Sequence, residues 1–153
     1  MIASLAYALH VVFAALWVGG MAYALLALRP ALVELDGPER LRVTVAAHGR
    51  FFRLVWHAMP IVLVTGYVIL FGHYNGFRGV GWHVHLMHLT GLLMAAIFVL
   101  IFLGPFRGMK AALAARDFGA AQDASARVRK LVGVNLALGL LTIAVAAWGR
   151  LGA

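Results

Sequence analysis

The stretch Gly79–Phe106, GVGWHVHLMHLTGLLMAAIFVLIFLGPF, decides the fold because it runs for 28 residues without Asp, Glu, Lys or Arg. A helix needs about 20 apolar residues to cross the hydrocarbon core of a bilayer. Three further uncharged stretches meet this requirement: Ile2–Leu28, Leu54–Phe77 and Leu131–Gly149. We therefore predict one all-α domain over residues 1–153, an integral membrane up-down-up-down four-helix bundle with spans at about 3–28, 52–72, 83–106 and 130–149.

The composition favours lipid over water as the solvent of this chain. Hydrophobic residues make up 64% of its 153 residues, charged residues make up 12%, and the mean hydropathy is +0.94. Soluble domains have about 45–50% apolar and about 25% charged residues. The chain has no cysteine, which excludes disulfides, thiolate metal sites and thiol redox chemistry. The net charge of +8 does not indicate nucleic-acid binding, because the basic residues flank apolar spans and form no soluble basic face.

The basic residues predict which way the bundle is inserted. Only Arg78 and Arg150 flank one side of the spans, and the other side carries eleven of the thirteen Lys and Arg residues. The cytoplasmic flanks of membrane helices carry excess Lys and Arg, so we expect both termini on the non-cytoplasmic face. The eleven residues are Arg29, Arg40, Arg42, Arg50, Arg53, Arg107, Lys110, Arg116, Arg127, Arg129 and Lys130.

Two histidines within the spans are the leading candidates for chemistry. Ionisable side chains inside a membrane are costly and usually face the interior of the bundle. His10 lies about 12 Å from the outer end of the first span, and His88 lies about 9 Å from the outer end of the third. These helices are diagonal neighbours in an up-down-up-down bundle. We expect the two imidazoles to meet in one layer of the bilayer, where they can be the axial ligands of a haem.

Small, aromatic and polar residues accompany these two histidines. Trp17 shares a helix face with the first histidine, Gly20 lies three residues further on, and Gly91 follows the second histidine by three. Small residues allow a helix or a haem edge to approach closely. Asn135 belongs to a small and polar stripe on the fourth span, and Arg78 lies at the outer surface, where Arg can pair with a haem propionate.

The same residues also suit copper. His85 and His88 are neighbours on one helix, and neutral imidazole binds copper, zinc, iron or nickel. Met21, Met87 and Met94 can add thioethers, which favour Cu(I). The residue pattern therefore leaves haem b and copper open, with the histidines of the first and third spans as ligands in either case.

The remaining histidines have simpler interpretations. His73 and His83 lie near the membrane interface, where we expect solvated side chains. His48 and His57 belong to the cytoplasmic half of the bundle. The fourth span has no histidine to face them, which counts against a second cofactor there.

Three segments carry a resemblance to a known family. The first span contains Leu9-His10 followed by Trp17-Val18-Gly19-Gly20-Met21, the third contains His85-Leu86-Met87-His88, and Arg129–Gly139 reads RKLVGVNLALG. These segments resemble the first span, the His-Met-His helix and the Arg-x-Leu-Val-x-x-Asn-Leu-x-Leu-Gly pattern of the copper-resistance protein D (CopD) family of bacterial membrane proteins. The first segment also resembles HemJ-type protoporphyrinogen oxidases, whose first span carries a histidine implicated in haem binding.

The two resemblances imply different functions. The likeness to CopD implies a multi-pass protein of the bacterial inner membrane, here with periplasmic termini, and suggests copper uptake. The likeness to HemJ implies haem b, although the lysine expected in the third span of those enzymes is replaced by Leu86-Met87-His88.

We predict a haem b protein that transfers electrons from membrane quinol to a periplasmic acceptor, with CopD-type copper binding or transport as the alternative. His10 and His88 are the expected ligands, with His85 in reserve. The spans contain no Asp or Glu, so the residues do not decide whether a substrate is turned over. A homodimer in the lipid bilayer is consistent with the large lipid-facing surface.

Overall fold

The fold was obtained as a computed structural model, which describes residues 1–150. The side chain of Arg150, which is expected to flank the spans on the non-cytoplasmic side, lies outside the described part of the chain. The described chain contains helices and no strand. Four helical stretches are long and apolar enough to cross a membrane: Ile2–Glu34, Gly37–Gly72, Trp82–Ala114 and Phe118–Gly149. The all-α fold with four helices long and apolar enough to span a membrane is confirmed.

The first and third stretches each contain a π-helical segment that adjoins or includes a proline. The first consists of α1 (Ile2–Tyr23), η1 (Ala24–Leu28), α2 (Arg29–Ala31) and η2 (Leu32–Glu34), and the third of α4 (Trp82–Ile101), η4 (Phe102–Phe106) and α5 (Arg107–Ala114). Pro30 follows the π-helical segment η1, and Pro105 lies within η4. A proline within a helix removes one backbone N–H and crowds the preceding turn, which accounts for the wider turns at these positions.

The second and fourth stretches are single long helices. Helix α3 (Gly37–Gly72) has a proline in its first turn, where the missing N–H costs nothing, and α6 runs over Phe118–Arg150. Asp117 caps α6, because its Oδ1 accepts a 2.9 Å hydrogen bond from the backbone N–H of Ala120. Each expected span lies inside one observed stretch, and all four stretches extend further on the side of the basic residues.

The connection between α3 and α4 is short and contains the helical turn η3 (Phe77–Gly79). Gly76 adopts φ +93°, a conformation that side chains disfavour, and its N–H donates to the carbonyl of Leu70 at 2.9 Å. Asn75 precedes it at φ 56°. These two residues therefore form a turn that closes the end of α3 and returns the chain into α4.

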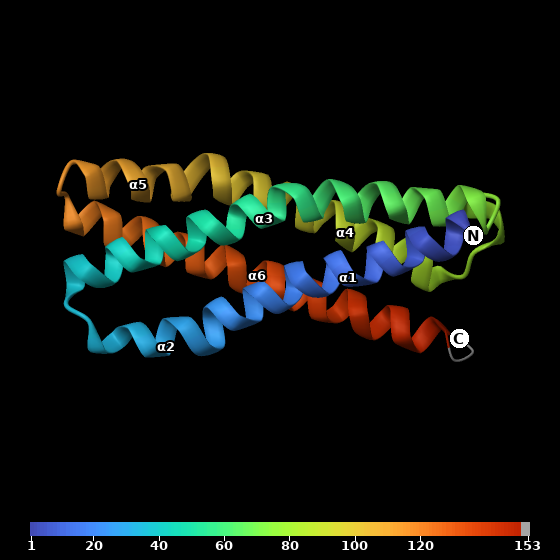
Figure 1. Ribbon diagram of the computed structural model, residues 1–153, viewed down its shortest axis with the longest axis horizontal. Helices are drawn as coiled ribbons and strands as arrows, with labels where there is room; N and C mark the ends of the chain where they lie inside the picture. The colour runs from blue at the N-terminus through green and yellow to red at the C-terminus, as the bar shows by residue number, and fades with distance from the viewer. Residues whose placement is uncertain (151–153) are drawn as a thin grey trace.

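Figure 1 shows the long helices side by side along one axis. Helix α1 begins, α3 passes into α4, and α6 ends at one end of the bundle, so we call this half the terminal half. The opposite half contains α2 and α5 and is called the basic half after the eleven Lys and Arg residues listed above. Helix α1 packs mainly on α3, and α4 packs mainly on α6, whereas the backbones of α3 and α4 lie further apart and are bridged by aromatic side chains such as Phe52 and Phe98.

An aromatic core fills the centre and the basic half of the bundle. Phe52 is 1% exposed and makes edge-to-face contacts with Phe98 and Phe106, with ring centroids 5.7 and 4.8 Å apart. Ile101 and Val128 beside them are also 1% exposed. Interiors packed this closely leave no path for an ion between the helices.

We expect Phe52→Ala to lower the free energy of unfolding by about 3–5 kcal/mol, because it leaves a cavity among the rings of α3 and α4. The measurement is reversible unfolding in mixed micelles. Leu54→Ala on the same helix is the control, since Leu54 is 40% exposed. Equal losses in the two variants would contradict a close-packed core at Phe52.

Candidate functional site

The terminal half of the bundle contains a cavity of about 630 Å³ that is lined by all four long helices. Among the described residues, its lining contains no Asp, Glu, Lys or Arg. The lining does contain four of the seven histidines and two of the six methionines: His10, His73, His83, His88, Met87 and Met94.

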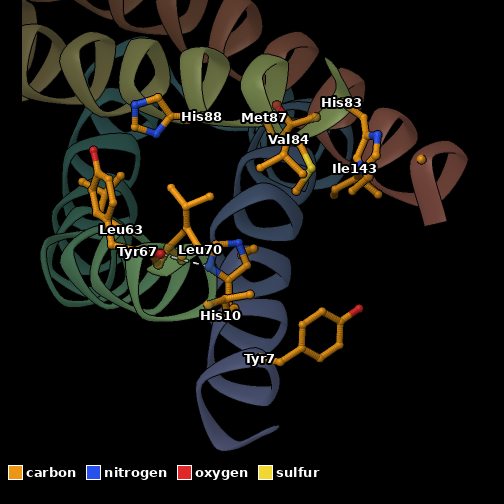
Figure 2. A pocket seen from close by; sticks show the side chains of 18 of the residues that line it. Tyr7, His10, Leu63, Tyr67, Leu70, His83, Val84, Met87, His88 and Ile143 are labelled. Carbon is orange, nitrogen blue, oxygen red and sulfur yellow. Dashed lines mark hydrogen bonds between the residues drawn. The ribbon is translucent and has the colours of Figure 1, made fainter. Parts of the chain in front are cut away.

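His10 is held to the neighbouring helix by a hydrogen bond that fixes its tautomer. Its Nδ1 lies 2.9 Å from the carbonyl oxygen of Val62 on α3 and 3.3 Å from Oγ1 of Thr65. A carbonyl can only accept, so Nδ1 carries the proton and Nε2 keeps a free lone pair. Figure 2 shows the ring directed from α1 into the cavity, with this hydrogen bond on its α3 side. This geometry is typical of histidines that ligate metals.

A glycine on α3 makes room for the His10 ring. A Cβ atom at Gly66 would lie 3.2 Å from Cε1 of His10, closer than most side-chain contacts. Gly66 follows Thr65 directly, so the hydrogen-bonding groups and the space for the ring come from one turn of α3. The ring therefore packs against α3 and is hydrogen-bonded to it.

His88 lines the same cavity but takes a different set of neighbours. Its ring packs edge-to-face on Tyr67 and Phe77, with centroids 5.4 and 5.1 Å apart. In Figure 2 it lies beside Tyr67, while His10 lies beyond Leu70. No hydrogen bond or ring contact joins His10 to His88 in the described part of the chain. The structure brings the two histidines to one cavity without pairing their rings.

The other residues predicted for the site are divided between the cavity and its surroundings. Trp17, which is 3% exposed, and Gly91 line the cavity. His85 is exposed and stacks on Phe77, away from the lining, and Arg78 is also exposed. Gly20 lies outside the lining, and a Cβ there would collide with the ring of Phe51.

His83 is a cavity residue that sequence reasoning missed. The expectation of a solvated ring is wrong for its Nδ1, which is buried and has no hydrogen-bond partner. Gly81 and Gly149 lie against the ring. No pattern in the sequence pairs Gly149 with His83, because the contact joins the ends of two different helices. His73 is exposed, as expected, although it also lines the cavity.

The methionines lie at different depths, and Asn135 lies beyond the inner end of the cavity. Met87 and Met94 line it, whereas Met21 is 2% exposed and lies in the hydrophobic core. Asn135 is 1% exposed, and its Oδ1 has no hydrogen-bond partner. It lies one helical turn from the lining residue Gly139, toward the basic half. Beyond this level the aromatic core closes the bundle.

Imidazole and thioether groups are the potential metal ligands of this cavity. Within residues 1–149, no three His, Cys, Asp or Glu side chains come together closely enough to hold a metal ion. Histidine nitrogen together with methionine sulfur is a ligand set that favours Cu(I).

A comparison with family models matches residues 45–149 to Copper resistance protein D. The matched range covers more than two thirds of the chain and includes α4 and nearly all of α6, whereas α1 with His10 lies before it. Searches of curated proteins and of solved structures found no match. The likeness to HemJ-type enzymes has no match to support it. The match over residues 45–149 and the four apolar helices show that the chain belongs to the copper resistance protein D family and is a multi-pass membrane protein.

Proposed function

We propose that the protein binds copper, as Cu(I), in the cavity of its terminal half and serves in copper handling or transport. The observation that carries the proposal is the free Nε2 of His10, held in place by the bond from Nδ1 to Val62, in a cavity that Met87 and Met94 also line. Neutral imidazole and thioether together suit Cu(I).

The charge of the cavity supports a monovalent ion. Within the described part of the chain, its lining has no acidic side chain to balance the charge of a bound cation. The cost of moving an ion out of water rises with the square of its charge, so Cu(I) is favoured over Cu(II) or Zn(II). The hydrogen bond to Val62 keeps the His10 ring neutral and oriented before any ion arrives.

The expected orientation gives copper a direction of entry. The positive-inside rule puts the basic half in the cytoplasm and the cavity at the periplasmic side of an inner membrane. The core around Phe52 and Phe98 closes the bundle on the cytoplasmic side of the cavity. In this conformation the protein accepts copper from outside, and onward movement requires these rings to repack.

Haem b receives less support than copper. Bis-histidine ligation requires His10 and His88 to face one iron from opposite sides, whereas the His88 ring packs on Tyr67 and Phe77. The family match names copper resistance. Electron transfer from quinol to a periplasmic acceptor depends on that haem. Copper handling is therefore the function that these observations support best.

Loss of an outer-shell partner of a metal ligand costs about 10- to 100-fold in affinity. We expect His10→Ala to weaken Cu(I) binding by at least this factor, because it removes the cavity imidazole whose Nδ1 is bonded to the backbone of α3. Competition of the purified protein with a colorimetric Cu(I) chelator measures the affinity. His57→Ala is the control, since His57 is exposed and lies outside the cavity. Wild-type protein that binds no Cu(I), or that carries haem with a Soret band, would overturn the proposal.

We expect the double substitution Met87→Leu and Met94→Leu to lower the affinity for Cu(I) and to leave that for Zn(II) unchanged, because thioether selects the softer ion. Leucine conserves the volume of methionine, so the fold is retained. Titrations with the two ions in parallel give the comparison. Met109→Leu, at a fully buried position of the basic half, is the matched control. Equal losses for both ions would argue against sulfur ligands.

A further inference from the structure

The ring of His83 is fixed between the ends of two helices. His83 is the second residue of α4, Gly81 precedes that helix, and Gly149 lies near the end of α6. A Cβ at Gly81 would lie 2.7 Å from Cε1 of His83, and a Cβ at Gly149 would overlap the ring itself. Both positions must be glycine for the ring to stay where it is.

The polar edge of this ring is unsatisfied. Nδ1 of His83 is buried and has no hydrogen-bond partner in the described part of the chain. A buried polar atom without a partner costs about 1–3 kcal/mol, and native proteins rarely tolerate one. Because Gly81 and Gly149 enclose Nδ1, the ring can offer only Nε2 to an occupant of the cavity.

Met87 lies one turn further along the same face of α4. His83 and Met87 are four residues apart, and both line the cavity. In Figure 2 the two side chains lie on the same wall, with His10 on the helix across the cavity. His83 lies at the helix end, whereas His10 lies about 12 Å into α1. The His83 ring is therefore nearer to the mouth.

We propose that His83 and Met87 form an entry position for Cu(I), which receives the ion at the mouth of the cavity and delivers it to His10. This inference rests on the proposed copper function and adds a residue and an order to it. Ligands in two successive layers allow the ion to exchange one imidazole for another while the sulfur of Met87 stays bound. No proton or electron is transferred in this exchange.

Rapid mixing of the purified protein with Cu(I) tests the order, with tryptophan fluorescence as the signal because Trp17 lines the cavity. We expect His83→Ala to slow association by about tenfold or more and to leave the final affinity close to that of the wild type. His10→Ala is expected to lower the final affinity and to leave the association rate close to that of the wild type. His85→Ala is the control, since His85 is exposed outside the lining on the same helix.

Gly149→Ala gives an independent test that keeps the imidazole. The added methyl group displaces the His83 ring, so we expect the same slow association. Gly133→Ala on the same helix is the control, because a Cβ there meets nothing within 4 Å. Thermal unfolding of every variant is measured alongside. Variants at His83 and Gly149 that lose stability but take up Cu(I) at the wild-type rate would overturn the inference.

The two proposals fail in different ways. Wild-type protein that binds no Cu(I) would overturn the copper function and the entry position together. Wild-type protein that binds Cu(I) through His10, with His83→Ala taking up the ion equally fast, would overturn the entry position alone.

Discussion

The hydrogen bond from Nδ1 of His10 to the carbonyl of Val62 is the interaction on which the site depends. An imidazole inside a bilayer has no water to satisfy it, so a partner from the protein must hold its proton. The carbonyl of Val62 does so from α3, and the hydrogen bond thereby joins α1 to its main packing partner. One bond thus fixes the ring, its tautomer and the nitrogen left for a ligand.

The two halves of the bundle differ in how their interiors are filled. In the basic half, Phe52 and Phe98 pack the helices together and close the interior. In the terminal half, the four long helices surround a cavity of about 630 Å³. Gly66 and Gly149 contact histidine rings of this cavity, and a side chain at either position would crowd the ring. The result is a cavity that four histidines and two methionines help to line and that the aromatic core closes at its inner end.

Sequence predicted the helices well because hydropathy and charge set their number and position in lipid. It predicted the cavity residues His10 and His88 from depth alone. It could not predict that His85 turns away or that Gly20 packs on Phe51, because helices apolar all round carry little signal for their rotation about their own axes. It missed the cavity residue His83, whose Nδ1 is enclosed by Gly149 on a helix that is far away in the sequence.

The most direct test is X-ray absorption at the copper edge of the Cu(I)-loaded protein in detergent. A first shell of both nitrogen and sulfur, with the nitrogen contribution reduced in His10→Ala, is the predicted result. A shell of nitrogen and oxygen without sulfur, or one unaffected by that substitution, would contradict a copper site built from His10 and the methionines of α4.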